Sequence, residues 1–177
     1  MEKILFSEEQ RFTQKWIWIL IIVATLISVG PTIYGIFSQE ISGKPWGNNP
    51  TETSVLMVIL FIETVIMGGI IVLLLKMRLK LEIRLDGLWF SYPPLLRKIQ
   101  HIRKDEIVRF EVRKYNPVFE YGGWGMKGST KNKAYNVSGN SGLQLYLKNG
   151  KRILFGTKQS HSIEYAMKKM MNVERLE

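Results

Sequence analysis

The sequence has no cysteine in its 177 residues and only two histidines, His101 and His161. The absence of thiols excludes disulfide bonds, cysteine nucleophiles and thiolate metal sites. Neither histidine belongs to a pattern typical of a metal site or a catalytic triad. We therefore predict no catalytic residues, no metal and no cofactor, and we expect that the protein is not an enzyme.

Negative charge is scarce in the second part of the chain. Residues 1–75 carry four Lys or Arg and six Asp or Glu, a net charge of −2, whereas residues 76–177 carry twenty-one and nine, a net charge of +12. Near an anionic membrane surface each cation contributes ~1 kcal/mol of attraction. We expect membrane lipids, and not nucleic acid, as the counterpart of this basic region.

Two long apolar runs precede the basic region, at residues 16–37 and 55–75. At ~1.5 Å per residue the first run would reach ~33 Å as a helix, which matches a hydrocarbon core of ~30 Å. It is too long for the apolar part of a signal peptide, and no small-residue cleavage pattern follows it. We predict a two-helix transmembrane hairpin over residues 16–75. Residues 1–15 are expected to be a short cytoplasmic segment, either an interfacial helix or a tail, and we favour the helix.

The flanking charges predict the topology. The connector at residues 38–54 holds one cation, Lys44. The other flanks are richer in cations: Lys3, Arg11 and Lys15 before the first span, and Lys76, Arg78, Lys80 and Arg84 after the second. Because positive charge concentrates on the cytoplasmic side, we predict a multi-pass protein of the cell membrane with both termini in the cytoplasm.

Residues 76–177 show the patterns of a small β-rich domain. Apolar and polar residues alternate over 79–85, 88–92, 108–113 and 143–147, which predicts strands, and a hairpin signal predicts a further strand at 152–157. Residues 134–137 are a weaker strand candidate. Asp86-Gly87 and Asn149-Gly150 are hairpin turns by composition. Ser160 can cap a final helix whose apolar stripe contains Ile163, Ala166, Met167, Met170 and Met171. We expect a membrane helical hairpin joined to an α+β domain, with a mostly antiparallel sheet or partly open barrel closed by a C-terminal helix.

Three segments carry a resemblance to a known family. They are residues 113–125 (RKYNPVFEYGGWG), 134–145 (AYNVSGNSGLQL) and 156–158 (GTK). The whole chain resembles a bacterial family of proteins with two transmembrane helices and a C-terminal pleckstrin-homology-like (PH-like) domain. The resemblance implies that fold and no particular activity. In PH domains that bind phosphoinositides, a basic loop between the first two strands holds the headgroup. Here we expect Asp86-Gly87 at that position, which is short and acidic and argues against a headgroup site there.

The Gly-rich stretch at residues 115–140 combines aromatic rings with amides, as recognition surfaces do. Our candidate interaction surface consists of Asn116, Phe119, Tyr121, Trp124, Tyr135, Asn136 and Asn140. In the alternative interpretation these rings cover the mouth of the barrel and the asparagines hold turns. Gly123–Gly128 also matches G-x-G-x-x-G, but no helical pattern follows it, so we expect a glycine-rich turn and no phosphate loop.

The polar residues of the two apolar runs form a second group of interest. Glu63 lies in the middle of the second run, where a charged residue is costly, so a carboxyl group there requires a partner. An antiparallel pairing of the spans would place Ser28 at the depth of Glu63, with Thr25 on the same stripe of the first span. We favour a hydrogen bond across the helix pair. A contact in an oligomer, or the movement of protons or ions, remain alternatives.

These observations lead to one main functional expectation and two alternatives. The main one is a non-enzymatic adaptor or scaffold whose PH-like domain recruits a protein or peptide to the membrane. We expect a protein partner or a homo-oligomer. The first alternative is the sensing of anionic lipids, with candidate lipid contacts at Lys76, Arg78, Lys127, Lys131 and Lys133. The second is a small oligomeric protein that conducts protons or ions through Glu63.

Overall fold

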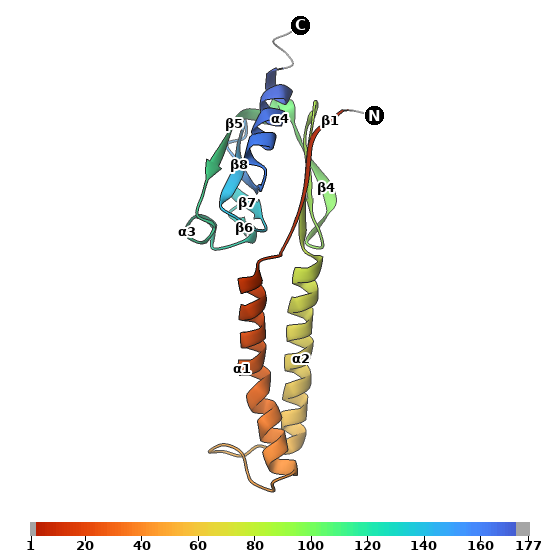
Figure 1. The fold of residues 1–177 in the computed structure, drawn as a ribbon, viewed down its shortest axis with the longest axis vertical. Helices are drawn as coiled ribbons and strands as arrows, with labels where there is room; N and C mark the ends of the chain where they lie inside the picture. The colour runs from red at the N-terminus through yellow and green to blue at the C-terminus, as the bar shows by residue number, and fades with distance from the viewer. Residues whose placement is uncertain (1–2, 173–177) are drawn as a thin grey trace. The chain divides into compact units, whose positions relative to one another are not determined.

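A computed structural model describes residues 3–172 of the chain (Figure 1). It divides into two compact units. One unit is Gln14–Leu75. The other combines the N-terminal segment up to Thr13 with the segment from Lys76 onward, so the first unit is an insertion within the second.

The inserted unit consists of two long helices, α1 (Lys15–Glu40) and α2 (Thr53–Lys76), which run side by side in opposite directions (Figure 1). At ~1.5 Å per residue they extend ~39 Å and ~36 Å, so each is long enough to cross a bilayer. Their apolar side chains face outward: Ile27 is 71% exposed and Phe61 is 69% exposed. The predicted pair of helices, each long and apolar enough to span a membrane, is confirmed.

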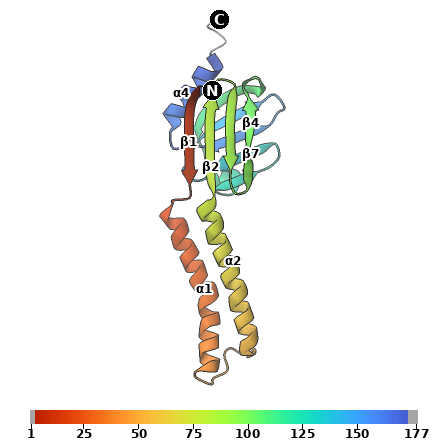
Figure 2. The same ribbon diagram turned by 90° about the vertical axis from the view of Figure 1, so that its right-hand side faces the viewer.

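The second unit contains two sheets. The first has the strand order β1-β2-β3-β4, with β1 at Ile4–Arg11, β2 at Arg78–Arg84, β3 at Gly87–Tyr92 and β4 at Leu96–Arg103. All neighbouring strands in it are antiparallel, and Figure 2 shows the four strands lying in this order. Successive strands follow the chain, apart from the helical insertion between β1 and β2.

The second sheet has the order β5-β8-β9-β7-β6 and contains a parallel pair, β7 with β9. A short 3-10 helix, η1 (Lys104–Glu106), leads into it from β4. Its strands and the helix between β5 and β6 are β5 (Ile107–Lys114), α3 (Pro117–Tyr121), β6 (Gly125–Gly128), β7 (Asn132–Asn136), β8 (Ser141–Leu147) and β9 (Arg152–Gly156). The expected α+β arrangement with mostly antiparallel strands is therefore confirmed. The described strands form two sheets, where a single sheet or a partly open barrel was expected.

The last helix, α4 (Ser160–Asn172), contacts β1 and β2 of the first sheet and β5 and β8 of the second. Four residues of its predicted apolar stripe are buried: Ile163, Ala166, Met167 and Met170. They join a core formed by the facing strands, whose largest fully buried side chains include Leu79, Leu81, Ile83, Leu88, Tyr92, Leu143, Leu145, Leu154 and Phe155. The C-terminal helix thus joins the two sheets through their common core.

The expected helix or tail at residues 1–15 is wrong, because Ile4–Arg11 forms strand β1. This strand pairs with β2 from Ile4↔Arg84 to Arg11↔Arg78. Its inward positions are Phe6, Glu8 and Gln10, and two of these three are polar. The apolar alternation that identifies a half-buried strand is therefore absent from the sequence. Burial of Glu8 and Gln10 is possible because both bond to residues 156–158, far along the chain.

The sequence patterns also fail to predict strand β4, which is the fourth strand of the first sheet. Its apolar residues Leu96, Ile99 and Ile102 are three apart, which is not the period of a strand. The turn at Asp86-Gly87 is present as predicted, but it joins β2 to β3. The connection between the first two strands is the helical insertion, so the expectation that Asp86-Gly87 is that connection is wrong.

Candidate functional site

The candidate interaction surface is built around α3, a helix of five residues between β5 and β6. Asn116 caps it: the side-chain oxygen accepts hydrogen bonds from the backbone N–H groups of Val118 and Phe119, both at 3.1 Å. Pro117 occupies the first turn, where its missing N–H costs nothing. The helix ends at Tyr121 and is followed by Gly122, whose φ of 76° is the left-handed conformation that favours glycine. These signals define a short helix within a stretch expected to be irregular.

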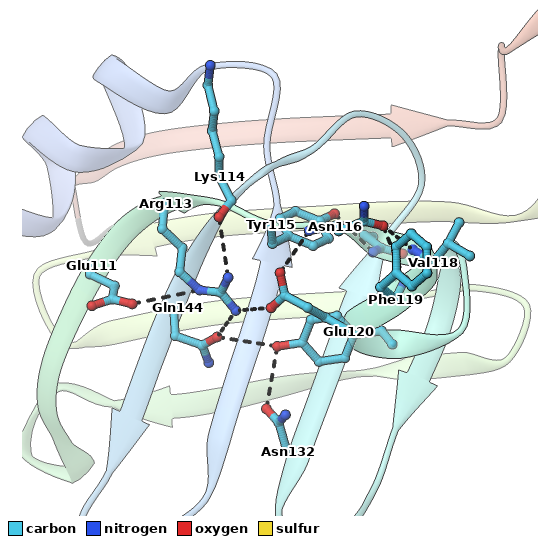
Figure 3. Close-up of polar contacts among 12 residues, drawn as sticks. Glu111, Arg113, Lys114, Tyr115, Asn116, Val118, Phe119, Glu120, Asn132 and Gln144 are labelled. Atoms are coloured by element: carbon cyan, nitrogen blue, oxygen red, sulfur yellow. Dashed lines mark hydrogen bonds and ion pairs between the residues drawn. The ribbon is translucent and has the colours of Figure 1, made fainter.

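An ion pair fastens α3 to β5. The Arg113 guanidinium donates to Glu120 Oε2 at 2.7 Å and to Gln144 Oε1 at 3.2 Å (Figure 3). The other oxygen of Glu120 accepts from the backbone N–H of Asn116 at 2.8 Å. The hydrogen bond from Arg113 holds the pKa of Glu120 below its usual value, so the carboxylate is charged at neutral pH. The helix is thus fixed at both its start and its side.

Val118 and Phe119 are the side chains that this bracing presents to solvent. Phe119 is 89% exposed and Val118 is 54% exposed. Figure 3 shows them on α3 apart from the contacts of Arg113 with Glu111, Gln144 and Glu120. Because the Phe119 ring is exposed, it buries little apolar surface within the fold and contributes little to folding stability. It has the properties of an anchor residue, which gains free energy when a partner covers it.

The other aromatic and amide residues of the predicted surface are placed differently. Tyr121 and Tyr135 are buried, at 7% and 6% exposure, and Asn136 is fully buried. Asn136 accepts from the backbone N–H of Gly125 and donates to the Tyr115 hydroxyl, so it links β7 to β6 and to the end of β5. These three residues therefore support the fold, as the alternative interpretation expected.

Trp124 and Asn140 are intermediate cases near the same loop. Trp124 is half-buried and its indole Nε1 donates to the carbonyl of Gly139 at 3.1 Å. Asn140 is exposed, and its carbonyl accepts from the backbone N–H of Tyr115. Of the seven predicted residues, Asn116 and Phe119 remain at the exposed part of the α3 site, and the structure adds Val118, Arg113 and Glu120 to it. The signal for the added residues was Asn-Pro followed by Glu120 and Gly122, the pattern of a capped short helix.

The candidate lipid contacts fall into two groups. Lys127, Lys131 and Lys133 lie on the β6–β7 hairpin, where Lys127 and Lys131 are exposed and Lys133 is half-buried. Lys76 ends α2, and Arg78 begins β2 in the other sheet, where it forms an ion pair of 3.5 Å with Glu9. The five candidate residues are therefore divided between the β6–β7 hairpin and the stretch where α2 leads into β2.

The predicted pairing in the helical unit is present. Ser28 Oγ of α1 donates to Glu63 Oε1 of α2 at 3.2 Å. Thr25 bonds within its own helix, to the carbonyl of Ile21. Glu63 Oε2 is buried without a hydrogen-bond partner in the described chain. The depth match between Ser28 and Glu63 that the antiparallel pairing predicted is confirmed.

Two further motifs have structural outcomes. Gly123–Gly128 contains strand β6 and no helix follows it, in agreement with a glycine-rich turn. Within residues 3–172, no group of three or more ligating side chains comes together that could hold a metal ion.

Comparisons of the chain with family models, with curated proteins and with solved structures find no match.

Proposed function

We propose that this protein is a membrane-anchored adaptor, in which α1 and α2 cross the cell membrane and the β-rich unit recruits a protein partner at the cytoplasmic face. Outward-facing apolar side chains on both helices support the membrane anchor, because a soluble hairpin would leave them in water. The distribution of cations around the spans supports a cytoplasmic location of both termini.

The order of the elements supports a PH-like identity for the β-rich unit. A four-stranded antiparallel sheet comes first, a second sheet follows, and a C-terminal helix contacts both. The anchor lies in the connection between the first two strands, which is the place of the headgroup loop in PH domains that bind phosphoinositides. In this proposal the domain is held at the bilayer by its own covalent insertion and needs no headgroup for that purpose.

The exposed Phe119 on its braced helix is the single observation that carries the recruitment role. A phenyl ring contributes large contact area, and a rigid support reduces the entropy lost on binding. The neighbouring Val118 extends the apolar area to two adjacent side chains. Together they would form the centre of a small protein-binding surface.

Site-specific photocrosslinking in native membranes tests this role. A photoreactive phenylalanine at position 119 is expected to capture one discrete protein, which then co-purifies with the wild-type chain and not with Phe119→Ala. The same group at Tyr165, 68% exposed on α4, is the matched control and is expected to capture nothing discrete. A Phe119→Ala chain that recruits the captured protein as well as the wild type does would contradict the proposal.

The sensing of anionic lipids is the second candidate, supported by the lysines of the β6–β7 hairpin. The same experiment separates it from the adaptor role. Adducts with phospholipid at position 119, together with binding that disappears at high ionic strength, would favour the lipid role. Capture of a protein that survives high salt favours the adaptor.

A further inference from the structure

Strand β4 is an edge strand of the first sheet, with β3 on one side and no strand on the other in the described chain. The opposite edge of this sheet, β1, is contacted by α4. An open edge presents unpaired backbone N–H and C=O groups that can pair with another chain. We propose that β4 binds an extended acidic segment of a partner protein, which adds to the first sheet as a fifth strand.

A cleft on the inner side of β4 provides a place for side chains of the added strand. It has a volume of about 360 Å³ and lies between the two sheets. Its apolar lining comes from Phe90, Leu96, Ile102, Tyr135, Leu147 and Ile153. Polar groups of Gln100, Thr130 and Asn149 also line it. This combination of an apolar floor and a few polar groups is typical of a binding cleft.

A second, smaller groove lies on the outer face of the first sheet, lined by residues of β2 and β3 and, from β4, by Ile99. It has a volume of about 230 Å³ and includes Trp89 and Ile99, the latter 68% exposed. Because successive side chains of a strand point to opposite faces, an added strand would place alternate residues at the inner cleft and next to Ile99 on the outer face. In strand addition the backbone hydrogen bonds give affinity and a cleft for alternate side chains gives specificity, so the inner cleft beside the open edge suits this mode of binding.

The charges around the edge select an acidic partner. Lys133 and Lys151 line the inner cleft, and no Asp or Glu is among the described residues that line it. β4 itself carries Arg97 and Lys98, and also Arg103, which is paired with Asp105 at 3.5 Å and with Glu106 at 3.9 Å. Charged residues on an edge strand oppose pairing with a second copy of the same edge, because like charges would face each other. The same cations attract a segment of opposite charge.

Among the described residues of the outer groove the one carboxylate is that of Glu82, which is paired with a cation. It accepts from Arg84 at 2.7 Å. Neither groove contains Val118 or Phe119, so this site is separate from the α3 surface and goes beyond the proposed function. Its failure would leave the crosslinking result at position 119 untouched.

The test uses the full chain in nanodiscs of neutral phosphatidylcholine and three capped peptide probes. One probe has four Val-Glu repeats, the second has four Val-Lys repeats, and the third is the Val-Glu peptide with every backbone nitrogen methylated. We expect the Val-Glu peptide to bind at least tenfold more tightly than either of the others, because it alone has both the charge and the backbone donors. Binding should slow the hydrogen exchange of amides in residues 96–103.

Charge variants test the location. Lys133→Glu combined with Lys151→Glu should weaken binding of the Val-Glu peptide at least tenfold, whereas Lys169→Glu, on the exposed side of α4, should leave it within twofold. Absence of Val-Glu binding at millimolar concentration, or equal binding of the methylated peptide, would overturn the proposal. The peptide comparison on the wild-type chain decides the question even if the double variant does not fold.

Discussion

Glu8 in β1 and Thr157 after β9 are joined by a buried hydrogen bond although they lie 149 positions apart in the chain. Thr157 Oγ1 donates to Glu8 Oε2 at 2.6 Å, and the backbone N–H of Lys158 donates to Glu8 Oε1 at 2.9 Å. The neighbouring Gln10 donates from Nε2 to the carbonyl of Gly156 at 2.7 Å. The N-terminal strand is therefore bonded to the second sheet as well as to β2.

Replacement of Glu8 by alanine is expected to destabilise the β-rich unit. The change removes the acceptor of one buried donor, the Thr157 hydroxyl, and of one part-buried donor, the Lys158 N–H. An unsatisfied buried donor costs about 1–3 kcal/mol. Urea unfolding of the full chain in mild detergent, followed by tryptophan fluorescence, measures the loss. Glu9→Ala is the matched control, because the Glu9 ion pairs are exposed and exposed pairs contribute about 0–1 kcal/mol. Equal losses in the two variants would contradict this role of Glu8.

The same contacts explain why part of the fold could be predicted from the sequence and part could not. β2, β3 and β8 follow the period of two, because their inward residues are apolar and the local pattern is enough to find them. β5 was found from the same pattern, but its register shifts near Val108, which is 60% exposed while Ile107 is buried. β1 has Glu8 and Gln10 at inward positions, and only their distant partners at residues 156–158 make their burial possible. A pattern read along the chain contains no information on such partners.

Loss of the Glu120 carboxylate is expected to loosen α3. In Glu120→Ala the hydrogen bonds from Arg113 and from the Asn116 backbone disappear. A local loss of about 1 kcal/mol raises the open population roughly fivefold. Limited chymotrypsin digestion should therefore cleave after Phe119 about fivefold faster. Glu164→Ala, which removes an exposed ion pair with Lys168, should leave this rate unchanged. Equal rates in the two variants would show that Glu120 does not brace the helix.

The same brace has a defined pH dependence. The hydrogen bond from Arg113 lowers the pKa of Glu120. The stabilisation of α3 by the charged carboxylate is therefore complete above the ordinary pKa of a glutamate. It is lost as the pH falls through the lowered value. Chymotryptic cleavage after Phe119 is thus expected to be slow at neutral pH. An acid-stable protease with the same preference should cleave the wild-type chain faster as the carboxylate becomes protonated. In Glu120→Ala the same fall in pH should not change the cleavage rate after Phe119.

Buried tyrosines predict a loss of stability at high pH. Burial raises the pKa of Tyr115 from 10 to about 12 and also raises that of Tyr92. Because the folded-state pKa is raised, the folding stability that depends on protonated Tyr115 is complete below pH 10 and is lost as the pH rises through about 12. Phenolate absorbance and circular dichroism should change together in this window. Tyr165→Phe, at an exposed position, should not alter the transition. Ionisation of all tyrosines near pH 10 in a folded chain would contradict the prediction.

Glu63 is expected to be a structural residue of the helical unit. Glutamine keeps an oxygen that can accept from Ser28, so Glu63→Gln should leave membrane abundance and assembly nearly unchanged. Quantitative immunoblotting of membranes and blue native electrophoresis measure both properties. Complete loss of partner recruitment at normal abundance would refute the structural role and favour proton or ion movement.

The candidate site was predicted in outline from its composition, and its details needed the fold. The stretch from residue 115 to 140 was identified because aromatic rings and amides gather there. The sequence could not separate Phe119 from Tyr121, since both rings belong to the same short helix. Phe119 is exposed because Tyr121 is the ring that turns inward, where its single hydroxyl proton is shared between Gln144 Oε1 at 3.3 Å and Asn132 Oδ1 at 3.4 Å.

Cysteine accessibility tests the proposed membrane arrangement most directly, because the native chain contains no cysteine. Single cysteines are placed at exposed positions in β1, the connector and the β8–β9 turn, as Ser7→Cys, Asn48→Cys and Lys148→Cys. A membrane-impermeant maleimide on intact cells should label only the Asn48→Cys chain, and permeabilisation should make the other two reactive. Labelling of Ser7→Cys or Lys148→Cys in intact cells would contradict a cytoplasmic β-rich unit anchored by a transmembrane hairpin.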